Sequence, residues 1–156
     1  MPTQTHTPLA SITLSGNDPS VTISSIPQNY RDLVLICATA SDDQYRQYRI
    51  RINGDTGNNY YGISISQGGS SQGSATEATF FNNGSPGLTT PQITNFFDYS
   101  KTDRRKTFIH QSGSVETTMI SGVQWQNTSA ITSIQVYTPV GNFTAGSTIS
   151  LFGIVG

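Results

Sequence analysis

Residues that could carry out acid–base chemistry or bind a metal ion are few and scattered in this chain of 156 residues. The two histidines, His6 and His110, are far apart, and no HxH, HExxH or CxxC spacing is present, so a transition-metal site is not expected. Glycoside hydrolysis requires two carboxyl groups about 5–10 Å apart. Most of the nine acidic residues stand instead at turns or strand ends, where they serve the backbone. The sequence predicts no catalytic residue, and we expect a protein that is not an enzyme.

The segment 53–58, with the sequence Asn-Gly-Asp-Thr-Gly-Asn, comes nearest to a metal-binding motif. Oxygen ligands suit Ca²⁺, but a calcium loop also needs a bidentate glutamate further along, and none follows here. A tight turn requires the same residue types. The sequence therefore predicts a structural turn, with no metal and no cofactor.

This turn connects two segments that have the pattern of β-strands. Residues 46–52 alternate apolar with charged or polar side chains, as in a strand with one buried face, and residues 60–66 form the second segment. The dipeptide Asn53-Gly54 accommodates the positive φ angles of a tight hairpin turn. We therefore expect a β-hairpin at this place.

The same alternation and the same turn residues recur along the rest of the chain. They predict about nine or ten short strands, and Pro and Gly interrupt any helical period. Residues 32–39 are almost continuously apolar, which is typical of a central strand covered on both faces, whereas residues 67–75 and 139–146 are expected to be loops. The pattern predicts an all-β fold, an antiparallel β-sandwich of the jelly-roll type, whose first and last strands could pair.

Apolar residues at alternate positions of these segments are predicted to form the core. Cys37 lies in an apolar run and is expected to be a small buried hydrophobe, since a single cysteine forms no internal disulfide. The other residues predicted to be mostly buried are Leu33, Leu35, Ile50, Ile52, Ile63, Ile65, Val123, Trp125, Ile134, Val136, Ile149 and Leu151.

The composition limits the classes of partner. Only 11% of the residues are charged and the net charge is −1, so no nucleic-acid partner is expected. The one basic cluster, Arg104-Arg105-Lys106, is predicted to be the solvated end of a strand. No apolar run approaches 18 residues and no export signal is recognisable, so we expect a protein that folds in a cytoplasm and has no membrane partner. The neutral, hydroxyl-rich surface suits packing against other protein.

Residues 1–8 are predicted to form an extended arm in front of a single β-sandwich domain, residues 9–156. The arm is polar and contains two prolines, which favour an extended conformation. Because it lacks apolar residues that could dock on its own domain, we expect it to contact a neighbouring protein. The candidate partner-binding residues are Pro2, Thr3, Gln4, Thr5, His6, Thr7 and Pro8.

Several segments resemble a family of small virion proteins and domains of tailed bacteriophages, including phages of cyanobacteria. They are SIPQNYRDLVL (25–35), RINGDTGNNY (51–60), FDYS (97–100), WQNTSAITSI (125–134), GNFTAGS (141–147) and ISLFGI (149–154). These segments span most of residues 20–154. Each is a strand-and-turn pattern, and none marks an active site. The resemblance implies a virion structural protein with a jelly-roll-like fold, on either the capsid or the tail.

Two functions are compatible with this resemblance. The first is a capsid decoration (cement) protein, assembled in the host cytoplasm, that binds the major capsid protein and copies of itself, as a homotrimer, on the outer surface of the shell. The low charge and the self-contained domain favour it. The second is a tail-associated module that recognises host glycans. Aromatic residues that could stack on sugars in that case are Tyr45, Tyr48, Tyr60, Tyr61, Phe80 and Phe81.

Overall fold

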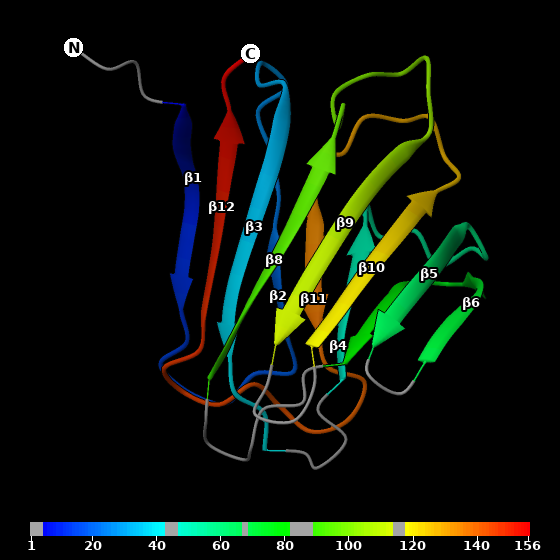
Figure 1. Cartoon of the computed structure of the whole chain (residues 1–156). Helices are drawn as coiled ribbons and strands as arrows, with labels where there is room; N and C mark the ends of the chain where they lie inside the picture. The colour runs from blue at the N-terminus through cyan, green and yellow to red at the C-terminus, as the bar shows by residue number, and fades with distance from the viewer. Residues whose placement is uncertain (1–4, 43–46, 67–68, 82–88, 114–117) are drawn as a thin grey trace.

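The computed structural model describes residues 5–42, 47–66, 69–81, 89–113 and 118–156. These residues form twelve β-strands in two antiparallel sheets, and there is no helix among them (Figure 1). No part of the described chain therefore forms a helix that could span a membrane. The predicted all-β, jelly-roll-like sandwich is confirmed, with more strands than the nine or ten expected from the sequence.

The larger sheet has eight strands and the smaller sheet has four. In spatial order the larger sheet consists of β1 (His6–Thr13), β12 (Thr148–Ile154), β3 (Asp32–Thr39), β8 (Thr90–Phe97), β9 (Lys106–Gly113), β10 (Thr118–Trp125), β5 (Tyr60–Ser66) and β6 (Gly69–Ala75). The smaller sheet consists of β2 (Ser20–Ile23), β11 (Ile134–Tyr137), β4 (Gln47–Ile52) and β7 (Ala78–Phe81). The predicted pairing of the first and last strands is present as β1 with β12.

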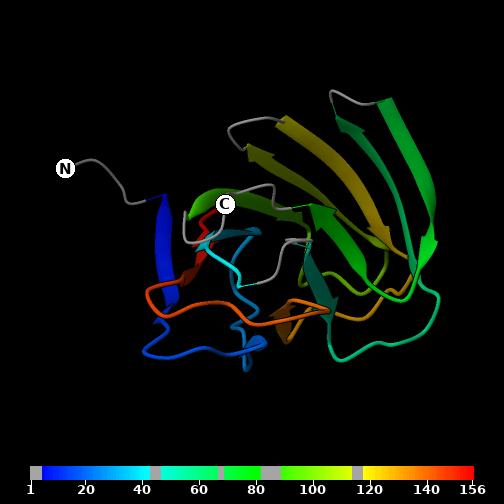
Figure 2. The ribbon, with the colours of Figure 1, turned by 90° about the horizontal axis from the view of Figure 1, so that it is seen from below.

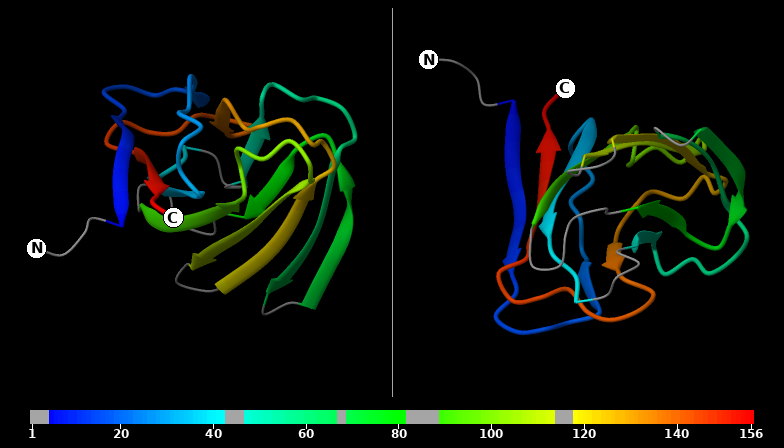
Figure 3. Two further views of the ribbon diagram at one scale, coloured as in Figure 1. Left: turned by 90° about the horizontal axis from the view of Figure 1, so that it is seen from above. Right: turned by 60° about the horizontal axis from the view of Figure 1, so that its bottom comes forward.

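The two sheets pack face to face, and the larger one curves around the smaller one. Figure 2 shows this curvature from below, and Figure 3 shows the two layers from two further directions. Strands β5 and β10 of the larger sheet both contact β7 of the smaller one. One hydrophobic core fills the space between the sheets, as expected when each strand buries every second residue.

Ten of the twelve residues predicted to be buried lie in this core, and so does Cys37. Trp125 is among the largest fully buried side chains, and its indole nitrogen donates a hydrogen bond to Asp55. The prediction is wrong for Ile63 and Ile65, which are 46% and 59% exposed. On β5 the inward face carries Tyr60 and then small residues, so the isoleucines point to the opposite face of the sheet.

The predicted hairpin between residues 46–52 and 60–66 is not formed. Its turn has the expected geometry, with φ angles of 52° at Asn53 and 67° at Gly54, but the two strands belong to different sheets. Strand β4 pairs with β11 and β7, while β5 pairs with β10 and β6. Both edges of β4 are therefore occupied, and the turn carries the chain from one sheet to the other.

Two other expectations about individual segments need correction. Residues 69–75, expected to lie in a loop, form β6, which pairs along its whole length with β5. Strand β3 is central in its sheet but is covered on one face only, because Ile36 on the opposite face is exposed. The reason is that no layer packs on the outer face of the larger sheet in the described part of the molecule.

Strand β1 begins inside the segment that was predicted to be an arm. His6, Thr7 and Pro8 pair with residues of β12, and the register shifts between Pro8 and Ala10. Backbone hydrogen bonds hold this strand, so it does not need the apolar side chains that the sequence lacks here. The domain described by the structure therefore starts before residue 9.

Candidate functional site

The outer face of the larger sheet carries a band of exposed apolar side chains that crosses five strands. Cross-strand pairing brings these residues together, although they are far apart in the sequence: Ile36 is opposite Ile93, and Ile120 is opposite Ile65. We call this set the apolar band. It consists of Ile36, Ile93, Phe97, Ile109, Ile120, Tyr61, Ile63 and Ile65.

The apolar band contains no charge. None of the outward-facing residues of β8, β9, β10 and β5 is charged; their polar neighbours are uncharged residues such as Gln111, Gln124 and Asn95. A shallow hollow of about 260 Å³ lies at one end of the band, between Ile93, Gln111 and Thr118. Such a face can lose its water without leaving an unpaired charge behind.

The inward face is unusually polar at one end of the same strands. Gln92 and Thr94 on β8, His110 on β9 and Ser121 on β10 are all buried, while the isoleucines next to them in sequence are exposed. The side-chain amide of Gln92 has no hydrogen-bond partner within the described structure, and the same is true of the His110 Nε2 atom. The usual distribution of apolar and polar residues is thus reversed in this part of the sheet.

His110 is a buried titratable group at the centre of this region. Its ring stacks on Phe80 with 3.8 Å between centroids and lies 5.6 Å from the Tyr48 ring. Its Nδ1 atom is 3.0 Å from the Thr94 hydroxyl. Burial lowers the pKa of His110 to about 3, so the ring is neutral at physiological pH. Among the described residues its side-chain contacts are Thr94, Phe80 and Tyr48, and none of these is an acidic group that would orient it as a general base.

The outer face of the smaller sheet is polar instead. Arg49 and Arg51 on β4 both bind the carboxylate of Glu77, at 2.6 and 3.2 Å, and Arg51 also donates to the Tyr137 hydroxyl at 2.9 Å. Partial burial tends to raise the pKa of Glu77, but hydrogen bonds from Thr76 and Tyr137 and the two arginine charges outweigh it, so the net shift is downward. The two outer faces of the sandwich therefore differ sharply in polarity.

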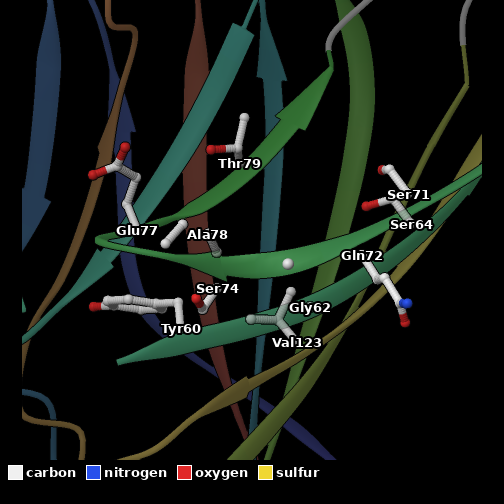
Figure 4. A pocket seen from close by; sticks show the side chains of 12 residues that line it. Tyr60, Gly62, Ser64, Ser71, Gln72, Ser74, Glu77, Ala78, Thr79 and Val123 are labelled. Carbon is white, nitrogen blue, oxygen red and sulfur yellow. The ribbon is translucent and has the colours of Figure 1, made fainter. Parts of the chain in front are cut away.

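A pocket of about 190 Å³ opens between β5, β6 and β7 (Figure 4). Small residues such as Gly62, Ser64 and Ser71 form much of its wall, and the labelled Tyr60 ring lies at one end. That ring is 1% exposed, so it offers no face for stacking on a sugar. Glu77, the one acidic residue of the lining, is held by its two arginines. Among the described residues of the lining, Glu77 is the one carboxylate, whereas glycoside hydrolysis requires two.

The turn predicted to be structural is tied into the fold by Asp55. Its carboxylate accepts hydrogen bonds from Trp125 Nε1 at 2.7 Å, from the Asn59 amide at 2.9 Å and from the Gly57 backbone at 2.8 Å. Both of its oxygens are thus engaged by internal donors. Within the described ranges, no three histidine, cysteine or acidic side chains come together as metal ligands would.

The candidate partner-binding residues of the arm divide into two groups. Pro2, Thr3 and Gln4 lie outside the described residues. Thr5 and His6 are exposed next to each other, with the Thr5 hydroxyl 3.0 Å from the His6 ring, and β1 contains His6, Thr7 and Pro8. These residues lie at the β1 edge of the larger sheet, whereas β5, which carries part of the apolar band, lies near the opposite edge.

The aromatic residues considered as a glycan platform do not form one surface. Tyr48, Tyr60 and Phe80 are buried in the core, and only Tyr61 is exposed, within the apolar band. Tyr45 and the Phe81 side chain lie outside the described structure.

The basic cluster is also different from the expectation. Arg104 and Arg105 are exposed, but Lys106 is buried at the start of β9. Its ammonium group donates to the carbonyls of Arg104 and Thr128, at 2.7 and 3.0 Å, and burial lowers its pKa. Cys37 is buried as predicted, and burial raises the pKa of its thiol to about 12, which makes it a poor nucleophile.

Sequence reasoning missed the apolar band because it assigned Ile63 and Ile65 to the core. A local signal was present: on β5, Tyr60, Gly62 and Ser64 alternate with the isoleucines, so the strand has one small-residue face and one bulky face. Which face turns inward depends on the partner strands, and these are not neighbours in the sequence.

No protein-family model and no curated protein matches this sequence. Among solved structures, an exo-inulinase from Aspergillus awamori aligns with 96% of the chain at 10% identity and a TM-score of 0.50, and the chain spans 29% of that enzyme's chain. A galectin from Caenorhabditis elegans aligns with 94% of the chain, over 96% of its own length, at 8% identity and a TM-score of 0.42. At such identities the likeness concerns the β-sandwich fold alone.

Proposed function

We propose that this protein is a capsid decoration protein of a tailed bacteriophage, which binds the outer surface of the shell through the apolar band. The observation that carries the proposal is the reversed polarity at one end of β8, β9, β10 and β5. Their isoleucines face outward while a glutamine, a histidine and several hydroxyl groups are buried. A domain that worked alone in water would gain stability from the opposite arrangement. The proposal also rests on the resemblance of the sequence to phage virion proteins.

The partner of the apolar band is an uncharged, apolar surface of the major capsid protein. Contact between two such surfaces is driven by the hydrophobic effect, so it needs no charge complementarity and depends little on salt. The arginine-rich outer face of the smaller sheet then faces solvent. Binding to the mature shell alone stabilises that shell by mass action, in proportion to the binding free energy.

A tail-associated glycan-binding module is less well supported. Its aromatic platform would require exposed rings, but of the four candidates whose side chains are described, three are core residues. The pocket beside Tyr60 offers hydroxyl groups without an exposed ring.

Two measurements test the proposal. The first is the copy number in purified virions, by quantitative mass spectrometry: a decoration protein is present in numbers comparable to those of the major capsid protein, whereas a few copies per particle would contradict the proposal. The second is rebinding to undecorated shells. I65K and I120K each place a charge in the apolar band and should reduce occupancy at least tenfold, while T22K, at an exposed site on the other sheet, should not. Equal occupancy for all three variants would rule out the apolar band as the contact.

A further inference from the structure

The two edges of the larger sheet are protected to very different degrees. Edge strands leave backbone N–H and C=O groups unpaired, and proteins usually protect them with proline, charge or a bulge. β1 has two of these features, Pro8 and the register shift that follows it. β6, at the other edge, has none: its sequence GSSQGSA contains no proline and no charge, and its register with β5 is continuous. Figure 1 shows β6 at the margin of the sheet, with no strand beyond it.

The sequence of β6 is suited to pairing with itself. In an antiparallel pair centred on Gln72, Ser71 is opposite Gly73 of the partner subunit and Ser70 is opposite Ser74 of the partner subunit. Every opposed pair then joins small, uncharged residues, apart from the two glutamines at the centre. No like charges meet, and no bulky side chains collide.

We propose that two copies of this chain associate through β6, so that their larger sheets join into one continuous sheet with a twofold axis at Gln72. The contact is isologous, and it leaves no free β6 edge in the dimer. It goes beyond the proposed function, because it concerns the edge of the sheet and needs no capsid. The dimer takes the place of the homotrimer expected from the sequence.

The apolar band supports a second copy as the occupant of this edge. On the outer face, Ile63 is opposite Gln72 and Ile65 is opposite Ser70, so the band extends to the strand next to β6. A twofold axis at Gln72 places the two bands side by side across the pair of β6 strands. One dimer then presents both bands on a single face, and each band strengthens the binding of the other to a common partner.

The test uses the full-length protein and the charges that would meet across the axis. Ser70 and Ser74 are both exposed, so they tolerate substitution. In S70K/S74K, lysines oppose lysines in the dimer, and in S70E/S74E glutamates oppose glutamates. Sedimentation equilibrium should give twice the chain mass of 16.8 kDa for the unmodified protein and the single mass for each variant alone. An equimolar mixture of the two variants should regain the dimer mass, which also shows that both are folded.

Three outcomes would overturn the proposal: an unmodified protein that is a monomer or a trimer, a lysine variant that keeps the dimer mass, or a mixture that stays monomeric although each variant has a normal thermal transition. Amide hydrogen exchange provides a measurement without substitutions. Exchange in residues 69–75 should slow as protein concentration rises, and exchange independent of concentration would equally refute the pairing. If a peptide of the capsid protein covers β6 instead, protection of these amides will require that peptide.

Discussion

Acidification should destabilise this domain before its carboxyl groups are protonated, because of His110. The pKa of this residue is about 3 in the folded protein and 6.5 ordinarily. A histidine with a depressed folded-state pKa binds its proton more readily in the unfolded chain, so its contribution to stability is complete above pH 6.5 and falls as the pH drops toward 3. With about 1.4 kcal/mol per pKa unit, the expected loss between pH 7 and pH 4.5 is roughly 2–3 kcal/mol.

Between pH 7 and pH 4.5, no other titratable group near His110 in the described structure is expected to change its charge. The titratable group that faces His110 is Tyr48. The Tyr48 hydroxyl in turn lies 3.3 Å from the Cys37 thiol. Burial raises the pKa of both groups, so neither titrates below pH 7. The pKa of Glu77 is lowered in the folded state from its ordinary value of 4.5. The stability that Glu77 contributes is therefore lost only as the pH falls to about 4.5 and below.

Urea unfolding followed at several pH values between 7 and 4.5 measures the effect. H110F keeps an aromatic ring against Phe80 but cannot be protonated, so its stability should change little over this range, whatever its absolute value at pH 7. H6Q, at the exposed histidine, serves as the control and should retain the slope of the unmodified protein. If H110F loses as much stability as the unmodified protein, the burial argument for His110 is wrong.

Three further predictions concern packing and can be tested by chemical denaturation. A Cβ atom on Gly153 would lie 2.4 Å from the Tyr30 ring, whereas one on Gly122 would meet nothing within 4 Å; G153A should therefore destabilise the protein by about 1–3 kcal/mol and G122A by much less. Q92M removes an amide whose two polar atoms are buried without partners in the described structure, so it should leave stability unchanged or raise it by about 1 kcal/mol. W125A should cost roughly 3–5 kcal/mol, and a loss below about 1 kcal/mol would show that the indole is not part of the core.

Local patterns were sufficient to predict most of the strands, β6 excepted, and most of the core. Leu33, Leu35, Ile149 and Leu151 occupy alternate positions of their strands, and all four are buried as expected. The same logic failed at Ile63, because alternation defines two faces without saying which one is covered. It also failed for the hairpin at Asn53, where the turn formed as predicted but the strands were already paired with other elements.

The candidate site could not be read from the sequence for a related reason. The apolar band joins residues from β3, β8, β9, β10 and β5, and their adjacency follows from a strand order that connects distant segments. Strand β6 shows the same limitation more strongly. Its seven residues, all small except Gln72, have no apolar period, and it is a strand because β5 offers a complete row of backbone partners.

The reversed polarity of the larger sheet can be explained in two ways, and their consequences differ. If it only reflected a poorly optimised core, the buried polar groups would be scattered and the exposed isoleucines would not lie opposite one another. Instead, Thr94 is opposite His110 and His110 is opposite Ser121 on the inner face, while Ile120 is opposite Ile65 on the outer face. The buried polar residues and the exposed isoleucines thus lie on opposite faces of the same strands. An arrangement that forgoes folding stability in one continuous region supports the proposal that this region binds a surface of another protein, because an uncharged aliphatic face suits such a contact.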